Sequence, residues 1–325
     1  MAQLTLAQAL NEALRYAMRA DDRVMVMGED VGTSGGVFRI TDKLQAEFGE
    51  DRVRDTPLAE SGIVGTAVGL AIYGFKPVVE MQFDGFTYPA FEQIISHVAK
   101  YRSRTMGKLN LPMVIRIPYG GGIGAVEHHS ESLEAYFTHT AGLKVVTPST
   151  PSDAFRLLVA AIEDPDPVVF LEPKRRYWIK EDVELPVTDG LPMGRARVVR
   201  EGTDCTLISY GPSMRTVEEA ADEAAKDGVA CEVIDLRSLQ PCDFETVMAS
   251  VKKTGRAVIV TEAPVSGSFA SEVAARISEQ DFESLHAPVM RVGGYDIPYP
   301  PAKVEDLHLP DIDKVLDAVD AVLNY

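Results

Sequence analysis

The segment that best combines reactive side chains with a useful position is residues 55–65, which read DTPLAESGIVG. Its carboxylate, Glu60, follows an extended stretch and precedes a helix-like run whose closely spaced glycines would let a backbone or a ligand approach. An acid in the first turn of a helix is often only a partner for the positive end of the helix dipole. It can equally be a carboxyl group half buried against an apolar ring, where it shares or donates a proton. The residue types alone leave both interpretations open.

A glycine-rich loop followed by paired histidines is the second candidate. Residues 118–131 read PYGGGIGAVEHHSE, and half of the six histidines of the chain lie between residues 128 and 139. Glycines tolerate positive φ and close contact, so the loop is typical of a segment that approaches a ligand. His128 and His129 could bind a metal, but no carboxylate or cysteine completes a recognisable set at metal-ligand spacing. Proton transfer, or orientation of an anionic substrate, is the favoured role.

A third segment, residues 80–92, leaves a strand-like run and enters a helix-like one with the sequence EMQFDGFTYPAFE. We interpret Phe83 and Phe91 as packing residues. Phe86 lies just beyond the carboxyl end of its strand, which is where open α/β sheets bind ligands. An exposed ring at that place could stack on an aromatic ligand.

Composition and absent motifs exclude several functions. The chain lacks a Walker loop, a GxSxG elbow and a GxGxxG fingerprint, and its GEDVG stretch at residues 28–32 is acidic where a pyrophosphate would lie. A net charge of −17 argues against a nucleic-acid partner and suits either solubility or a basic protein partner. Three widely spaced cysteines predict neither a disulfide framework nor a zinc site. Because no apolar run is long enough to span a bilayer and no targeting peptide is visible, we expect a cytoplasmic chain that does not bind membranes.

Strand-like and helix-like runs alternate through the first half of the chain. Such alternation predicts βαβ units, and hence a mainly parallel sheet with helices on both faces. Hydroxyl and carboxylate side chains around Pro151 predict a helix start there. The expected strands are 24–27, 76–81, 113–117, 143–146 and 168–171, and the expected helices are 6–18, 62–73, 86–101 and 152–163.

A second alternating set follows a stretch that looks like a linker. From residue 173 to residue 194 the pattern dissolves into charges, prolines and a TDG turn at residues 188–190. The sequence therefore predicts two doubly wound α/β domains in series, residues 1–185 and 186–325. In the second domain the expected strands are 205–210, 230–235, 257–261 and 289–292, and the expected helices are 215–227, 243–254 and 267–279.

Several of these segments resemble the beta subunits of the decarboxylating component of 2-oxo acid dehydrogenases that depend on thiamine diphosphate. The resemblance runs the whole length of the chain and includes residues 28–32, 55–62, 128–132, 142–148 and 232–237. Within the family the chain is most similar to the branched-chain type, through residues 80–83, 88–91, 99–102, 129–132, 262–264, 269–272 and 294–296. Pyruvate-specific relatives usually carry QHSQ where this chain has HHSE, so branched-chain 2-oxo acids, pyruvate and acetoin all stay open as substrates.

The resemblance implies a transketolase-like fold. Residues 1–185 would hold the aminopyrimidine ring of thiamine diphosphate, and residues 186–325 would form the transketolase-type carboxyl-terminal domain. Glu60 would contact a ring nitrogen and promote the tautomer that deprotonates the thiazolium carbon. His129 would act on the intermediate during transfer to the lipoyl arm.

Three further residues are implied as cofactor contacts. Leu58 and Gln82 would touch the cofactor, and Phe86 would stack on the aminopyrimidine ring. Branched-chain relatives often carry tyrosine at this aromatic position, so a hydroxyl contact is missing in this chain.

The resemblance also implies metals and partners. Relatives bind a structural potassium ion mostly through backbone carbonyls, and the matching positions here are Leu111, Met113, Val114, Ala161, Asp164 and Asp166. Members of this class hold the diphosphate and Mg²⁺ with a Gly-Asp-Gly stretch, which occurs nowhere in these 325 residues. The implied partners are an alpha subunit that carries the magnesium, in a heterotetramer of two alpha and two beta chains, and a lipoyl acyltransferase core.

Two other functions compete with this one. The α/β alternation alone would also suit an NAD-dependent dehydrogenase, but the glycine fingerprint is missing. A non-catalytic scaffold subunit that recruits partners through its acidic surface would leave Glu60 and the paired histidines without a role.

Overall fold

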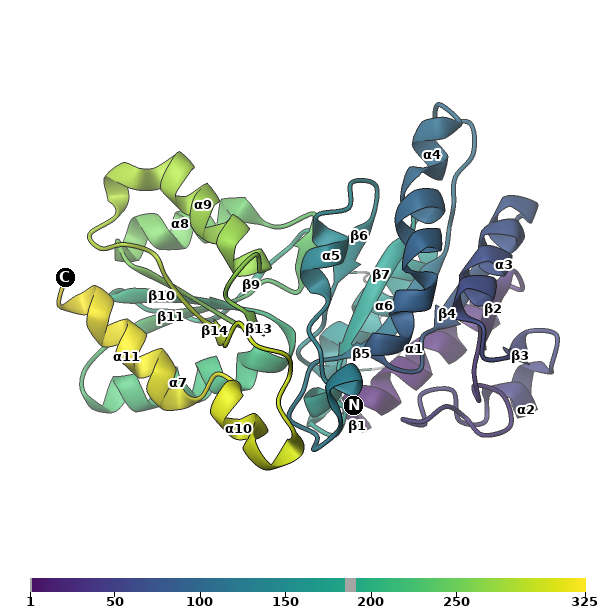
Figure 1. Cartoon of the computed structure of the whole chain (residues 1–325), viewed down its shortest axis with the longest axis horizontal. Helices are drawn as coiled ribbons and strands as arrows, with labels where there is room; N and C mark the ends of the chain where they lie inside the picture. The colour runs from purple at the N-terminus through teal and green to yellow at the C-terminus, as the bar shows by residue number, and fades with distance from the viewer. Residues whose placement is uncertain (1, 185–190) are drawn as a thin grey trace. The chain divides into compact units, whose positions relative to one another are not determined.

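The computed structural model describes residues 2–184 and 191–325 and divides the chain into two compact units (Figure 1). Unit 1 comprises Met1–Tyr119 and Tyr136–Met193, and unit 2 comprises Gly120–Ala135 and Gly194–Tyr325. The paired histidines thus belong to unit 2, although the chain on both sides of their loop belongs to unit 1. The expected boundary between residues 185 and 186 and the TDG turn lie outside the described residues.

Unit 1 is built on a parallel sheet. Its strands follow the order β6-β7-β5-β4-β2-β3, and all of these pairings are parallel. Strands β2, β5 and β7 are buried along their whole length, as expected where helices cover both faces of a sheet. The six strands are β2 (Val24–Gly28), β3 (Val53–Asp55), β4 (Lys76–Glu80), β5 (Val114–Tyr119), β6 (Lys144–Val146) and β7 (Val168–Pro173).

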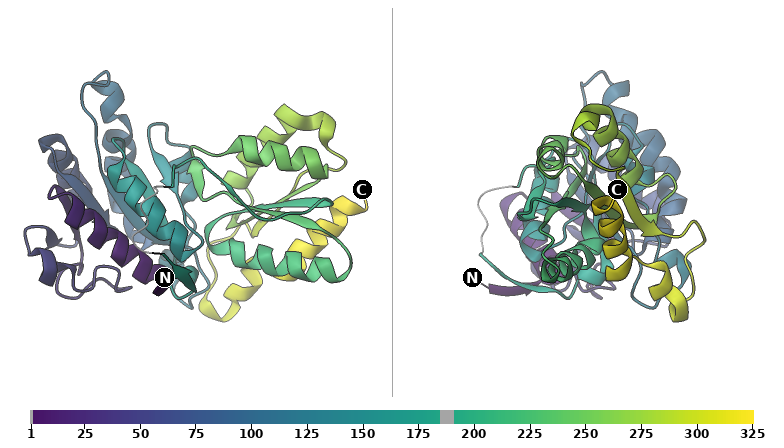
Figure 2. Two further views of the ribbon diagram at one scale, coloured as in Figure 1. Left: turned by 180° about the vertical axis from the view of Figure 1, so that it is seen from behind. Right: turned by 90° about the vertical axis from the view of Figure 1, so that its left-hand side faces the viewer.

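Two helices of unit 1 pack side by side and supply much of its apolar core. These are α1 (Leu6–Ala20) and α6 (Pro151–Glu163) (Figure 2). Thr5 closes the start of α1 in a capping box with Gln8, and Thr150 caps α6, so the helix start predicted around Pro151 is confirmed. The other α-helices are α2 (Leu44–Phe48), α3 (Glu60–Tyr73), α4 (Tyr101–Arg104) and α5 (Glu134–Thr138), which crosses the division between the units.

The prediction of a single helix at residues 86–101 is wrong. This part of the chain is helical but broken into short pieces of different pitch. Pro89 has no backbone N–H and therefore interrupts an α-helical ladder of hydrogen bonds; the piece that contains it is a 3-10 helix. The pieces are the 3-10 helix η1 (Asp84–Ala90), the π-helix η2 (Gln93–His97), the 3-10 helix η3 (Val98–Lys100) and α4.

The prediction of a linker at residues 173–194 is also wrong for residues 173–183, most of which form regular structure. Strand β7 continues to Pro173, the 3-10 helix η5 (Lys174–Arg176) follows, and β8 (Lys180–Val183) pairs antiparallel with β1 (Ala2–Thr5). Tyr177 and Val183 are buried in the core of unit 1. Apolar burial therefore outweighs the prolines and charges that suggested a linker.

Unit 2 carries a second α/β sheet, in the order β14-β13-β10-β11-β9, with only β9 antiparallel to its neighbour. Helices α7 and α11 cover one face of the sheet, and α8 and α9 cover the other (Figure 1). The strands of this sheet are β9 (Arg197–Arg200), β10 (Cys205–Ser209), β11 (Cys231–Asp235), β13 (Ala257–Pro264) and β14 (Met290–Gly294). Unit 2 also contains the short strand β12 (Ser238–Gln240), which is not part of this sheet. The helices are η4 (Glu127–His129), η6 (Gly211–Ser213), α7 (Met214–Lys226), α8 (Phe244–Thr254), α9 (Phe269–Asp281), η7 (Phe282–Ser284), η8 (Ala302–Val304), α10 (Glu305–His308) and α11 (Ile312–Leu323).

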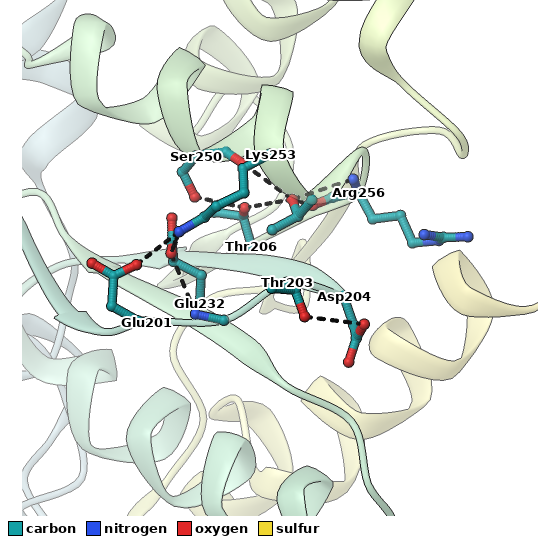
Figure 3. A network of polar contacts seen from close by, with 10 residues as sticks. Glu201, Thr203, Asp204, Thr206, Glu232, Ser250, Lys253 and Arg256 are labelled. Atoms are coloured by element: carbon teal, nitrogen blue, oxygen red, sulfur yellow. Dashed lines mark hydrogen bonds and ion pairs between the residues drawn. The ribbon is translucent and has the colours of Figure 1, made fainter.

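A polar network secures the amino ends of β10 and β11 (Figure 3). Lys253 on α8 lies between Glu201, at 2.7 Å, and Glu232, whose carboxylate is 2% exposed. Thr206 and Ser250 share a hydrogen bond of 2.7 Å beside them. Ligands of open α/β sheets bind at the opposite, carboxyl ends of the strands, so we assign this network a structural role.

No helix among residues 2–184 and 191–325 has both the length and the apolar character needed to cross a membrane.

Candidate active site

The order of the strands in unit 1 defines a topological switch point between β2 and β4. Strands β4, β2 and β3 are neighbours in that order, so the chain leaves β2 toward one side and then returns to β4 on the other. At such a switch point the connecting loops diverge beyond the carboxyl ends of the strands and leave room for a ligand. Residues that follow β2, β3 and β4 are therefore the ones to consider for binding.

Glu60 is the first residue of α3, shortly after β3 ends at Asp55. The connecting segment is tied to the end of β2, because the N–H of Thr56 donates to the carbonyl of Gly28 at 2.9 Å. Asp55 Oδ1 accepts the N–H of Gly32 at 2.6 Å. These bonds hold the partly exposed Glu60 side chain near the carboxyl end of β2.

Glu29 follows β2 directly and lies close enough to Glu60 for the two charges to interact. Its side chain is 5% exposed, and neither carboxylate oxygen has a hydrogen-bond partner among the described residues. Burial, with the negative charges of Glu60 and Asp30, raises the pKa of Glu29 to about 7. Two carboxyl groups close enough for their charges to interact, one of them buried, can hold a proton near neutral pH.

Residues that follow β4 add an amide and an aromatic ring near the carboxyl ends of these strands. Gln82 Nε2 donates to Asp30 Oδ2 at 3.2 Å, which joins the β4 loop to the β2 loop. Phe86 is half-buried in η1, against which α3 packs, and its ring lies edge-on to Phe83 with centroids 5.8 Å apart. Leu58 is 80% exposed. The loops that follow β2, β3 and β4 thus combine carboxyl groups, a half-buried aromatic ring and an exposed apolar side chain.

Glu29→Gln is expected to stabilise the protein at neutral and alkaline pH. The pKa of Glu29 rises from an ordinary 4.5 to about 7 on folding, so between these values the folded state binds more protons and stability falls as pH rises. Above pH 7 the loss is complete, on the order of 3 kcal/mol, and glutamine avoids it. Thermal unfolding of variant and parent at pH 5 and pH 8 measures this, and the same difference at both pH values would contradict a raised pKa.

A buried ion network lies at the end of β4 and joins it to β5 and β7. Arg116 donates to Glu172 through two bonds of 2.7 and 3.0 Å, and to Glu80 at 2.6 Å. Tyr177 donates its hydroxyl to Glu172 at 2.7 Å. All four side chains are buried, and burial raises the pKa of Glu80 although Arg116 opposes this. Because Glu80 ends β4, the network holds the strand end that leads to Gln82.

The histidine loop, defined here as residues 120–131, lies in unit 2. Its 3-10 helix η4 carries both histidines, whose rings pack edge to face with centroids 4.4 Å apart. The His128 side chain is 51% exposed and His129 is partly buried. The N–H of Gly120 donates to the carbonyl of Glu131 at 2.9 Å and closes the base of the loop. Within the described parts of the chain, no three His, Cys, Asp or Glu side chains are grouped to bind a metal.

The positions that match a potassium site lie in two adjacent segments. The N–H of Leu111 donates to the carbonyl of Pro165 at 3.1 Å, which brings the segments together. Lys144 contacts the carboxylates of Asp164 at 2.7 Å and of Asp166 at 3.6 Å. Because Lys144 neutralises these side chains, backbone carbonyls are the donors to consider, and the potassium site stays a prediction. The matching residues are Leu111, Met113, Val114, Ala161, Asp164 and Asp166.

Glu29 and Asp30 were not predicted as site residues. Along the sequence they only follow a buried strand, and the order β4-β2-β3 is what brings them to Glu60 and Gln82. An acid directly beyond a buried strand was the available signal. Asp30 also has a φ of 57°, in the left-handed region that few residues other than glycine adopt, and such conformations concentrate at functional sites.

Comparison with known proteins defines the class of this chain. Residues 2–179 match the transketolase pyrimidine-binding domain, and residues 194–315 match the transketolase C-terminal domain. The fold is similar to a solved structure described as a split-gene transketolase, inactive beta4 tetramer, with a TM-score of 0.81 and 25% sequence identity over 99% of this chain and 98% of that one. The chain is therefore a two-domain α/β protein of the transketolase class, which confirms the predicted fold.

The closer relatives define the family. The chain is 55% identical over 321 residues to the 3-methyl-2-oxobutanoate dehydrogenase subunit beta of Mycobacterium tuberculosis, covering 98% of this chain and 92% of the relative. It is 53% identical over 322 residues to the pyruvate dehydrogenase E1 component subunit beta of Leifsonia xyli, covering 99% and 95%. The Bacillus subtilis pyruvate dehydrogenase E1 component subunit beta is 47% identical over 327 residues, covering both chains fully. The chain belongs to the family of E1 beta subunits of 2-oxo acid dehydrogenases, as the sequence motifs predicted.

Proposed function

We propose that this chain is the beta half of an enzyme that oxidatively decarboxylates a 2-oxo acid and transfers the acyl group to a lipoyl group. The observation that carries the proposal is the pair Glu29 and Glu60 at the switch point of unit 1. A buried carboxyl group with a pKa of about 7 beside a second carboxyl group suits proton transfer at neutral pH. A scaffold subunit would have no use for such a pair.

Thiamine diphosphate fits the residues present. The Glu60 carboxyl group is partly exposed, and the buried carboxyl group of Glu29, whose charge interacts with it, has no hydrogen-bond partner among the described residues. Leu58 is exposed, and Phe86 is only half buried. These features suit a nitrogen-containing aromatic ring, which needs a proton partner on its edge and apolar contact on its faces. When bound, the cofactor supplies an acidic thiazolium carbon that adds to the oxo carbon and accepts the electrons left by decarboxylation.

The residues of this chain would bind the ring and control one proton. Glu60 would hold a proton between its carboxyl group and a ring nitrogen, in a charge-assisted hydrogen bond. Phe86 would stack on the ring, and Leu58 and Gln82 would complete its contacts. Glu29, when ionised, would place negative charge near that proton and so help to retain it.

An alpha subunit would supply the rest of the site. The chain contains no Gly-Asp-Gly stretch for magnesium and the diphosphate, and the strongest contacts of a diphosphate are to a metal ion. We infer a heterotetramer of two alpha and two beta chains that passes its acyl group to a lipoyl acyltransferase core. Calorimetry on the isolated chain and on the assembled pair tests this. Tight magnesium-dependent binding of thiamine diphosphate to the isolated chain would contradict it.

Branched-chain 2-oxo acids are the proposed substrates. The HHSE sequence at residues 128–131 favours them, while the relatives named above act, by name, on both 3-methyl-2-oxobutanoate and pyruvate. Turnover of the assembled pair on each substrate, compared as kcat/KM, decides between them. A higher kcat/KM on pyruvate would reverse the substrate assignment and leave the reaction class unchanged.

His129→Ala is expected to impair reductive acylation of a lipoyl domain more than decarboxylation measured with an artificial electron acceptor. A histidine that assists acyl transfer should contribute on the order of 10²–10⁴ in the first assay and much less in the second. His128→Ala is the matched control, because the neighbouring ring is the more exposed one. Equal losses in both assays would place His129 at an earlier step, such as substrate binding.

A further inference from the structure

The glycines of the histidine loop give it an unusual backbone. Gly120, Gly122 and Gly124 have φ values of 83°, 75° and 72°, in the left-handed region. When residues in the left-handed region alternate with residues outside it, successive N–H groups point toward one side. They then form a concavity that binds negatively charged groups. The part of the loop that leads to the histidines therefore presents a row of donors.

Two carboxylates of unit 2 accept hydrogen bonds from these N–H groups. Glu305, the first residue of α10, accepts the N–H of Gly122 at 3.1 Å on one oxygen and the N–H of Gly124 at 2.8 Å on the other. Glu262, in β13, accepts the N–H of Gly121. Each bond joins the loop to a residue far away in the sequence.

Tyr299 completes the arrangement. Its hydroxyl donates to Glu305 at 2.9 Å and lies 3.0 Å from the N–H of Gly122, which donates to it. The loop backbone also packs directly on this side chain, because a Cβ on Gly121 would collide with the Tyr299 ring and hydroxyl. The ring of His308 packs edge to face with the ring of Tyr299, with centroids 5.3 Å apart.

Burial makes these contacts strong. Glu262 is 3% exposed and Glu305 is 7% exposed. Hydrogen bonds from N–H groups to a carboxylate are about twice as strong as neutral ones, and a low local dielectric strengthens them further. Glycines lose the most backbone freedom on ordering, so a loop rich in glycine needs such an anchor to keep one conformation.

We propose that Glu305, with Glu262 and Tyr299, is a positioning residue that fixes the histidine loop so that His129 is held in place for acyl transfer. The inference rests on the proposed function. Glu305 acts through the loop backbone and touches neither the cofactor nor the acyl group. Its carboxylate fills the concavity that the glycines form, so the loop is ordered before any ligand binds.

Amide hydrogen exchange of the assembled enzyme tests the anchor independently of activity. Glu305→Ala should raise the exchange rates of the Gly122 and Gly124 amides by about tenfold or more, since local opening then lacks its strongest bonds. Asp306→Asn is the matched control, because it removes the same charge from the exposed neighbouring position on α10. It should leave exchange in residues 120–131 unchanged. Unchanged exchange in Glu305→Ala would overturn the proposal.

A double-mutant comparison tests the link to His129. Glu305→Ala should slow reductive acylation of a lipoyl domain by about 10²-fold, a typical consequence of small misplacement, while the artificial-acceptor rate changes much less. Glu305→Ala combined with His129→Ala should be no slower than His129→Ala alone, because both changes remove one function. Independent, multiplying losses would overturn the positioning role.

If Glu305→Ala does not assemble with its partner subunit, a milder variant can be used in its place. Tyr299→Phe removes one hydroxyl, and it should give a smaller rise in exchange with the same preference for the acylation assay. If the parent pair shows no turnover dependent on thiamine diphosphate, the proposed function fails, whereas the exchange experiment still decides whether Glu305 anchors the loop.

Discussion

Glu60→Gln is expected to lower turnover of the assembled enzyme by on the order of 10²–10⁴, the usual contribution of a positioned acid or base. Glutamine keeps the size of the side chain and can still donate a hydrogen bond to a ring nitrogen, but it cannot exchange a proton there. Glu60 is partly exposed at the start of α3. The fold, the assembly and most of the cofactor affinity should therefore survive.

Hydrogen–deuterium exchange at the acidic carbon of the cofactor, measured in the assembled variant, separates the two interpretations of Glu60. Exchange should slow together with turnover. Glu50→Gln removes a charge from an exposed position of the same unit and should change neither rate. If Glu60→Gln exchanges and turns over as fast as the parent enzyme, Glu60 is only a partner of the helix dipole.

Arg116→Met should cost about 3–5 kcal/mol of stability, because it leaves Glu80 and Glu172 buried without their shared cation. Arg116 and Glu172 are fully buried, and Glu80 is 4% exposed, so water cannot replace the lost bonds. The midpoint of thermal unfolding, at fixed protein concentration, should fall by several degrees.

Two further variants show whether the loss comes from the unpaired carboxylates. Glu80→Gln added to Arg116→Met should recover part of the stability, since one buried charge is then removed. Arg54→Met breaks an exposed ion pair with Asp51 and should leave the midpoint unchanged. A normal midpoint in Arg116→Met would mean that the network is not needed for the fold.

Local signals in the sequence were sufficient for most regular elements. The buried strands β2, β5 and β7 appear as short apolar runs, and α6 begins where its threonine cap and proline predict. The packing assigned to Phe83 and Phe91 is confirmed, because Phe83 contacts Phe38 and Phe91 contacts Phe137. These features depend on residues close together in the chain.

Two parts of the fold escaped prediction, a strand pair formed by a distant contact and a helical stretch that is divided into short pieces. Strands β1 and β8 are short and polar, and they form because they pair with each other although they are far apart in the sequence. The helical pieces between Asp84 and Arg104 follow the apolar pattern of a helix, but a proline and changes of pitch divide them. The spacing of apolar residues along the sequence predicts neither the pairing of distant strands nor a change of helix pitch.

By itself the sequence determined the class of fold and the family and singled out Glu60 as a candidate site residue, because these depend on motifs and on the alternation of strands and helices along the chain. Tertiary structure decided which groups lie near one another. The order β4-β2-β3 brings Glu29 to Glu60, and burial then raises the pKa of Glu29 to about 7. Likewise, Glu305 meets the glycine loop only through folding of unit 2. Proximity and desolvation arise from contacts between residues distant in the chain, so no local pattern of residues encodes them.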